Sequence, residues 1–112
     1  MENTRYLFSL FGQNGKEKDF FAALLESPVY VQATEHNNGY VIAPWKNQAG
    51  EEIIALFTAE ELTKAYHVSF KCFKARDVIE QFQEMTIILN PNSQEYILEL
   101  APDLTRFILE NA

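Results

Sequence analysis

The sequence predicts an α+β sandwich, in which helices pack on one face of a largely antiparallel or mixed sheet. Strand-like alternation of apolar and polar residues occurs early and late in the chain, and helical spacing of apolar residues occurs between and around it. The few glycines and prolines fall between these periodic segments, as turn residues do. The predicted order is a helix, three strands, a helix, a strand, a helix, two strands and a final helix.

The first predicted helix covers residues 16–26, where apolar side chains recur every four positions. The helix is expected to end at Ser27, because Pro28 disfavours helical dihedral angles in the residue before it. The β-branched and aromatic run at residues 29–31 then predicts a strand.

Asn38 and Gly39 predict a tight hairpin turn, since both residue types tolerate positive φ. On the returning strand, Pro44 cannot donate a ladder hydrogen bond, so pairing is expected to end or bulge there. With a third strand at residues 52–57, the first three strands are expected to form an antiparallel meander.

Residues 58–61 have the pattern of a capping box, in which the Thr58 hydroxyl accepts a helix amide and Glu61 reaches back to the cap amide. A helix at residues 59–66 is therefore predicted. The remaining predicted elements are a strand at 67–73, a helix at 75–84, a strand at 86–89, a turn at 90–93, a strand around 96–100 and a helix from Pro102.

The 112 residues suffice for one domain with its own core, so residues 1–112 are expected to form a single domain. Nine Lys and Arg against sixteen Asp and Glu give a net charge of −7, which argues against nucleic acid and anionic membranes as partners. Both halves of the chain carry more acidic than basic residues, and the longest acidic run is two residues, so the acidic charge is not clustered.

A cytoplasmic location is expected. The early apolar stretch at residues 6–11 is far shorter than the roughly 20 residues of a membrane span, and no signal-peptide cleavage site follows it. Cys72 is the only cysteine and cannot form an intrachain disulfide, which suits a reducing compartment.

No catalytic, cofactor-binding or metal-binding constellation stands out, so neither an enzyme nor a cofactor is expected. On a strand at residues 67–73, Cys72 and His67 point to opposite faces and cannot form a thiol–imidazole pair. Cys72 is expected in the core, as a small apolar residue. His36 and His67 are expected to be exposed, and no three residues have the spacing of zinc or iron ligands.

Aromatic residues supply the candidate interface. Trp45 lies at a strand end, where it either closes the rim of the core or forms an exposed anchor for a partner. Tyr6, Phe8 and Phe11 belong to an apolar segment within residues 1–15, which must pack on its own domain or on a second copy of the chain.

Three motifs occur in a familiar order: Phe20-x-x-x-Leu24-Leu25 before Pro28-Val29-Tyr30-Val31, Ala55-Leu56-Phe57-Thr58 before Glu60-Glu61-Leu62, and Ile87-Ile88-Leu89-Asn90-Pro91 before a short strand and a final helix. With them, the chain from about residue 20 to 111 resembles the SseB N-terminal-like domain family, named for an enhanced-serine-sensitivity protein. The resemblance implies a bacterial domain without accepted catalytic residues. Asn92-Ser93 departs from the family pattern, in which glycine often follows the proline.

These observations favour a small cytoplasmic protein-interaction or regulatory module, which acts through a protein partner or self-association. Two alternatives stay open. One is a small-ligand-binding protein or enzyme whose site is assembled from scattered residues such as His36, His67 and Glu52. The other is an immunity or chaperone-like protein for a toxin or a secreted partner.

Overall fold

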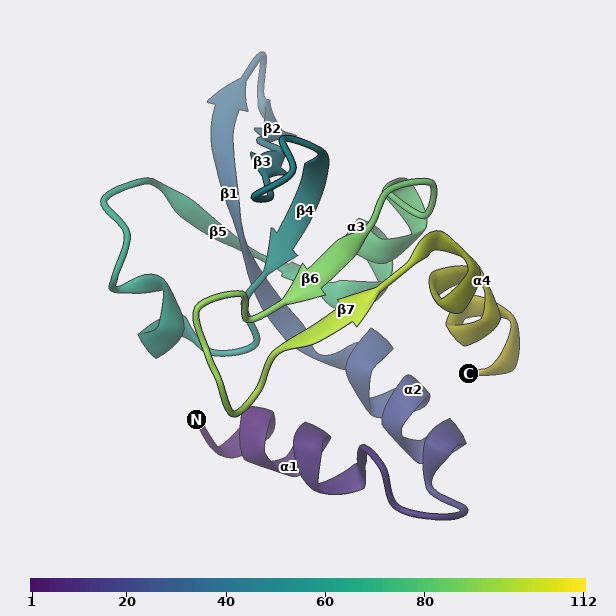
Figure 1. The fold of residues 1–112 in the computed structure, drawn as a ribbon. Coiled ribbons are helices and arrows are strands. Elements are labelled where there is room, and N and C mark those ends of the chain that lie inside the picture. Colours follow the sequence, from purple (N-terminus) through teal and green to yellow (C-terminus); the bar gives the residue numbers. More distant parts are fainter.

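Two β-sheets connected through one long strand lie at the centre of the protein, and four helices pack beside them (Figure 1). The computed structural model describes residues 1–112. The helices are α1 (Glu2–Leu10), α2 (Glu17–Glu26), α3 (Ala75–Gln81), α4 (Pro102–Asn111) and the short 3-10 helix η1 (Glu60–Thr63). The strands are β1 (Pro28–His36), β2 (Gly39–Ile42), β3 (Trp45–Lys46), β4 (Glu52–Leu56), β5 (Phe70–Lys74), β6 (Ile87–Leu89) and β7 (Leu98–Leu100). This is the predicted α+β fold, with one further helix at the N-terminal end.

Strand β1 belongs to the first sheet and also forms a backbone bridge to the second sheet. The sheet order is β2-β1-β5, and β5 pairs antiparallel with the first part of β1. On the opposite edge, β2 pairs with the second part of β1. Beside Tyr30 on that edge, Phe57 at the end of β4 exchanges two backbone hydrogen bonds with Tyr30, at 2.8 and 3.0 Å. The second sheet, β3-β4-β6-β7, is thereby joined to the first.

The hairpin turn between β1 and β2 lies one residue earlier than predicted. Asn37 and Asn38 have positive φ angles of 48° and 67°, and His36 pairs with Gly39. A two-residue turn of this kind needs positive φ at both central positions, and Asn tolerates that conformation better than other non-glycine residues. Gly39 therefore begins the returning strand instead of completing the turn.

Pro44 interrupts the returning strand, as predicted. Ala43 N–H still donates to the Gln32 carbonyl on β1 (3.0 Å), whereas Trp45 already pairs with Ile53 in the other sheet. The single return strand expected from the sequence is thus two strands, β2 and β3, in different sheets. The predicted three-stranded meander is wrong beyond the first hairpin, because β4 pairs with β3 and β6 and not with β2.

The second sheet is mixed. Strand β6 runs parallel to β4, with Leu56 opposite Leu89, and β7 runs antiparallel to β6. A parallel pair needs a crossover, and here η1, β5 and α3 supply it.

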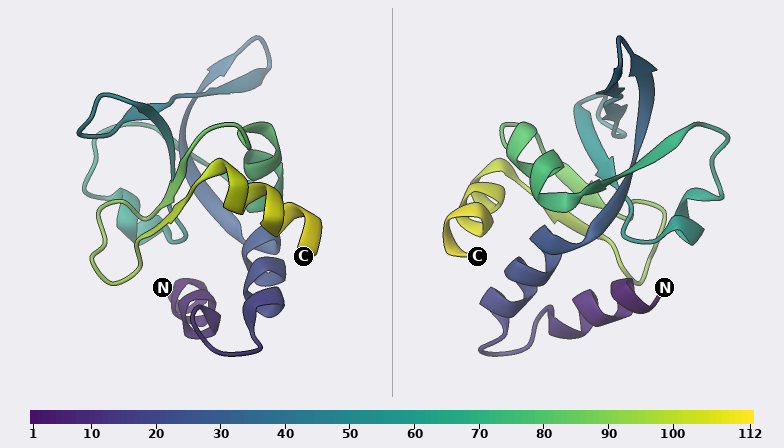
Figure 2. Two further views of the ribbon diagram at one scale, coloured as in Figure 1. Left: turned by 45° about the vertical axis from the view of Figure 1, so that its right-hand side comes forward. Right: turned by 180° about the vertical axis from the view of Figure 1, so that it is seen from behind.

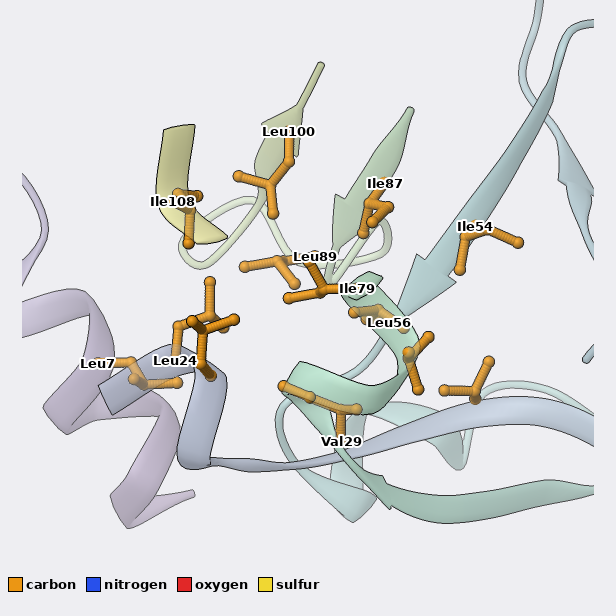
Figure 3. Packing of buried hydrophobic residues seen from close by; sticks show 14 of the residues in the cluster. Leu7, Leu24, Val29, Ile54, Leu56, Ile79, Ile87, Leu89, Leu100 and Ile108 are labelled. Carbon is orange, nitrogen blue, oxygen red and sulfur yellow. The ribbon is translucent and has the colours of Figure 1, made fainter. Parts of the chain in front are cut away.

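The main core lies between the sheets and the four helices. Figure 3 shows buried aliphatic side chains from the four α-helices and from strands β1, β4, β6 and β7 meeting there: Leu7, Leu24, Val29, Ile54, Leu56, Ile79, Ile87, Leu89, Leu100 and Ile108. The views in Figure 2 show α1 and α2 together at one end of the molecule, with α4 next to α2. The predicted helix at residues 16–26 and the helix that begins at Pro102 are both confirmed.

Helix α1 is absent from the predicted order, which assigns no helix or strand to residues 1–15. Thr4 and Leu7, one helical turn apart, are both fully buried, and Leu7 belongs to the main core. The N-terminal apolar segment therefore packs on the rest of this chain. The i, i+3 spacing of these residues is the sequence signal for α1.

The predicted capping box at Thr58 is wrong, and the predicted helix at 59–66 shortens to η1, which has no side-chain cap. The Thr58 hydroxyl lies 2.7 Å from the Thr4 hydroxyl and bonds to the Asn90 side chain. Glu61 bonds to the amino group of Met1 at 2.9 Å instead of the cap amide. Thr58 is buried, so its hydroxyl pairs with the polar groups enclosed beside it.

Candidate functional site

The polar residues considered as a scattered site do not come together. His36 ends β1 and its Nε2 lies 3.2 Å from Asn37 Nδ2, His67 precedes β5, and Glu52 begins β4. All three are exposed, and none lines any of the three cavities of the protein. Likewise, no three His, Cys, Asp or Glu side chains are grouped so that they could hold a metal ion. None of the helices combines the length and apolar composition needed to cross a membrane.

Trp45 lies at the rim of a second, smaller apolar cluster. Its indole N–H donates to Gln32 Oε1 at 2.6 Å, and its ring packs against Phe57, Tyr66 and Phe70, with centroids 5.0 to 6.4 Å apart. The side chain is half-buried. Trp45 therefore has the geometry of a residue that closes the rim of the core, and not that of an exposed anchor.

The aromatic residues of the N-terminal segment lie in three different environments. Tyr6 is 55% exposed on the outer face of α1. Phe8 is half-buried, with ring centroids 5.4 Å from Tyr96 and 6.4 Å from Phe20. Phe11 is 48% exposed, although its ring centroid lies 5.4 Å from that of Phe20. Phe11 is thus the one of the three that combines exposure with a place beside a cavity.

That cavity, here called the apolar groove, has a volume of about 260 Å³ and opens between the end of α1, α2, β7 and α4. Its lining is apolar apart from Gly12 and one charged side chain, Glu17: Leu10, Phe11, Gly12, Glu17, Phe20, Phe21, Leu98, Leu100, Leu104 and Ile108. Two pairs of elements from opposite ends of the chain build it, α1 with α2 and β7 with α4, and its floor is continuous with the main core through Phe20, Leu100 and Ile108.

Exposed apolar side chains extend the groove at the surface. Leu104 on its wall is 37% exposed, and Phe107 beside it is 51% exposed, with its ring centroid 5.8 Å from that of Phe21. Together with Phe11, they form an apolar surface around the opening. Contiguous exposed apolar surface of this kind marks interaction sites more often than single exposed residues do.

Acidic groups border the apolar groove. Glu17 lines it without an ion pair, and Asp103 and Glu110 stand four before and three after Phe107 on α4, so they flank it on one helix face. Of the nearby cations, Arg106 pairs with Asp103 and Glu84, and Lys16 pairs with Asp19. Lys18 is the one cation of α2 and α4 without a carboxylate partner, whereas two carboxylates of these helices, Glu17 and Glu110, have no cation partner, so the net charge beside the groove is negative.

A second cavity, here called the β5 cavity, has a volume of about 460 Å³ and lies between β5 and the segment after η1. It is lined by Tyr30, Glu60, Thr63, Lys64, Tyr66, Val68, Phe70, Lys71 and Cys72. Burial raises the pKa of the Tyr30 phenol, and the neighbouring Cys72 thiol and Glu60 carboxylate raise it further.

Cys72 is exposed, so its predicted place in the core is wrong. The predicted strand at 67–73 begins only at Phe70, and β5 is an edge strand of its sheet. Cys72 pairs with Tyr30 and faces the β5 cavity on the side away from the main core. Alternation along a strand distinguishes two faces, but it does not identify which face another element covers.

A run of basic residues in the sequence marks this region. It is not visible when charges are counted over each half of the chain. Residues 62–76 contain four of the nine basic side chains, Lys64, Lys71, Lys74 and Arg76, and no acidic one. The acidic protein therefore has a locally basic segment that runs from the end of η1 through β5.

Comparison with known proteins gave no match to any protein-family model, curated protein or solved structure. Membership of the SseB N-terminal-like family therefore stays a prediction from the sequence motifs.

Proposed function

We propose that the protein is a cytoplasmic protein-interaction module whose apolar groove receives a large apolar side chain from a partner protein. The observation that carries the proposal is the groove itself: about 260 Å³, apolar on nearly its whole lining, and surrounded by exposed Phe11, Leu104 and Phe107. Apolar anchors seated in pockets contribute most of the binding free energy in many interfaces.

The border of the groove supports a partner segment with basic residues next to its apolar anchor. Glu17 lines the groove, Asp103 and Glu110 flank the neighbouring Phe107 on α4, and the whole chain carries a net charge of −7. Charge complementarity of this kind speeds association and disfavours wrong partners. A second copy of this chain would bring two acidic borders together, which disfavours self-association through the groove.

Two synthetic amphipathic peptides test this proposal. They have leucine at identical helical positions, and one carries lysine where the other carries glutamate. We expect the leucine–lysine peptide to shift the backbone NMR signals of residues around Phe11, Phe21 and Leu104, and the leucine–glutamate peptide to leave them unchanged.

The variant Leu104→Glu places a charge in the wall of the groove, and Val41→Glu makes the same kind of change on β2, where Val41 is 52% exposed. Leu104→Glu is expected to abolish the shifts and Val41→Glu to retain them. Equal binding by both peptides, or shifts that survive Leu104→Glu, would contradict the proposal. So would a dimer, seen by light scattering, that Leu104→Glu dissociates, because the occupant would then be a second copy.

An immunity or chaperone-like role falls within the same proposal, with a toxin or secreted protein as the partner that carries the basic apolar segment. The alternative of a scattered active site finds no support in the geometry, since His36, His67 and Glu52 line no cavity.

A further inference from the structure

Strand β5 has an unpaired edge on the side of the molecule away from α4 (Figures 1 and 2). In its sheet, β5 pairs with β1 alone. Two hydrogen bonds bracket this pairing: Ala33 N–H to the Ser69 carbonyl at 3.2 Å, and Ala75 N–H to the Ser27 carbonyl at 2.9 Å. Because hydrogen-bonded and non-hydrogen-bonded pairs alternate between antiparallel strands, the backbone groups of Phe70 and Cys72 point away from β1.

The partner of Cys72 on β1 gives an independent check of this orientation. Tyr30 stands opposite Cys72, and both backbone groups of Tyr30 bond to Phe57 on the other edge of β1. Tyr30 therefore directs no backbone group toward Cys72. Phe70 and Cys72 thus offer two N–H donors and two carbonyl acceptors along the free edge, which is the pattern that an added strand requires.

Two hollows lie next to this edge. Phe70, Lys71 and Cys72 border the β5 cavity of about 460 Å³. Cys72, Phe73 and Lys74 border a shallower hollow of about 290 Å³ with Glu26 and Pro28. Since Cys72 lines both, the two hollows adjoin along the edge and leave room for side chains of a bound segment.

The charge of this region identifies the kind of segment. Residues 62–76 carry four basic side chains and no acidic one, in a chain with a net charge of −7. Lys71 has no carboxylate partner, and its Nζ lies 5.6 Å from the centre of the Tyr40 ring. Lys64 and Lys74 pair with Glu60 and Glu26 at 3.6 and 3.1 Å, but their side chains are 72% and 51% exposed.

We propose that the free edge of β5 binds an extended acidic segment of a partner protein, which adds to the sheet as a further strand. Two β5 edges from two copies would bring the Lys71 and Lys74 side chains of both chains together, and such lysines are a known protection of edge strands against self-pairing. This surface lies on different elements from the apolar groove, so the proposal does not depend on the proposed function.

The thiol of Cys72, the only cysteine, reports occupation of the edge. The probe is a short peptide of alternating valine and glutamate, and the readout is the rate at which iodoacetamide alkylates Cys72. We expect this peptide to slow alkylation at least severalfold, and a valine–lysine peptide to leave the rate unchanged. Two N-methylated forms of the first peptide, each lacking the N–H donors of one edge, test backbone pairing. The form methylated on the edge that faces β5 should no longer protect Cys72 from alkylation, and the form methylated on the outer edge should still protect it.

The variant Lys71→Glu reverses a charge on β5, and Lys18→Glu makes the same change on α2, where Lys18 is exposed. Lys71→Glu is expected to weaken binding of the valine–glutamate peptide roughly tenfold, which corresponds to about 1.4 kcal/mol, and Lys18→Glu to leave it within twofold. The proposal is overturned if both N-methylated forms protect Cys72 equally, or if the lysine peptide protects it as well. Stronger protection by an oligothymidine than by the acidic peptide would overturn it too, because the basic segment would then be a nucleic-acid site.

Discussion

Thr58 and Asn90 hold each other across the ends of the parallel strands β4 and β6. Thr58 N–H donates to Asn90 Oδ1 at 2.9 Å, and Asn90 Nδ2 donates to Thr58 Oγ1 and to the Tyr96 carbonyl, both at 3.0 Å. The Thr4 hydroxyl lies 2.7 Å from that of Thr58. All the side chains of this group are buried, so the network joins α1 to the ends of β4 and β6 through direct hydrogen bonds.

Replacement of Asn90 should be strongly destabilising. Asn90→Ala removes the partners of buried Thr58 groups and places alanine at a φ of 52°, so we expect a loss of roughly 2–4 kcal/mol. Asn90→Gly removes the same hydrogen bonds but tolerates the backbone conformation, and should cost about 1 kcal/mol less. Urea unfolding measures both. Equal losses in the two variants would exclude backbone strain as a contribution.

Two neighbouring residues of α1 should differ sharply in their contribution to stability. Leu7 is fully buried in the main core, whereas Tyr6 is 55% exposed. We expect Leu7→Ala to cost about 2–5 kcal/mol and Tyr6→Ala to remain within about 0.5 kcal/mol of the parent chain. Thermal melts followed by circular dichroism compare them. A small effect of Leu7→Ala would show that α1 is dispensable for the core.

Thr105→Val should stabilise the protein. The Thr105 hydroxyl is buried in α4 and has no hydrogen-bond partner, and valine has nearly the same shape. Removing an unsatisfied buried hydroxyl is expected to raise the free energy of unfolding by roughly 1 kcal/mol. Thr105→Ser is the control, since it keeps the hydroxyl and loses a methyl group. A valine variant no more stable than the parent would mean that the hydroxyl is satisfied in solution.

The carboxylate of Glu26 should titrate below its ordinary range. The hydrogen bond and the charge of Lys74, 3.1 Å away, lower the pKa of Glu26, and Arg76 lowers it further. Because the pKa is lower in the folded chain than in the unfolded one, the pair stabilises the fold above the ordinary carboxyl pKa, and this contribution is lost as the pH falls through the lowered pKa. NMR titration should show that the pKa of Glu26 is higher in Lys74→Ala than in the parent chain and is unchanged in Lys46→Ala.

The elements predictable from the sequence are those whose determinants are local. Pro28 ends a helix at Ser27, Pro102 occupies the first position of α4, and Pro44 interrupts the returning strand, each as expected from the chemistry of proline. The turn that begins at Asn90 is local as well, with Ser93 N–H donating to the Asn90 carbonyl at 2.9 Å.

The features that sequence reasoning missed depend on contacts with distant parts of the chain. Thr58 has the pattern of a helix cap, but Thr4 and Asn90 take up its hydroxyl. Cys72 shares one face of β5 with Phe70, but the apolar cluster that covers Phe70 does not extend over Cys72, so Cys72 is exposed. The apolar groove and the β5 cavity are each built by several elements, and neither leaves a motif in the sequence beyond the basic stretch at residues 62–76.

The shared strand β1 also determines the order in which the chain can fold. Its hairpin with β2 closes around two residues and has little loop entropy to overcome, whereas β5 reaches β1 only after the whole of β2, β3, β4 and η1 has been traversed. Likewise, β4 and β6 can pair only after the crossover between them, η1, β5 and α3, has become compact. The hairpin is therefore expected to form early, whereas the Thr4 hydroxyl meets its partner only once the ends of β4 and β6 stand side by side. In a nascent chain, Phe8 and Phe11 can pack on Phe20 of α2 early, but Phe8 reaches Tyr96 only when the last third of the sequence is being made.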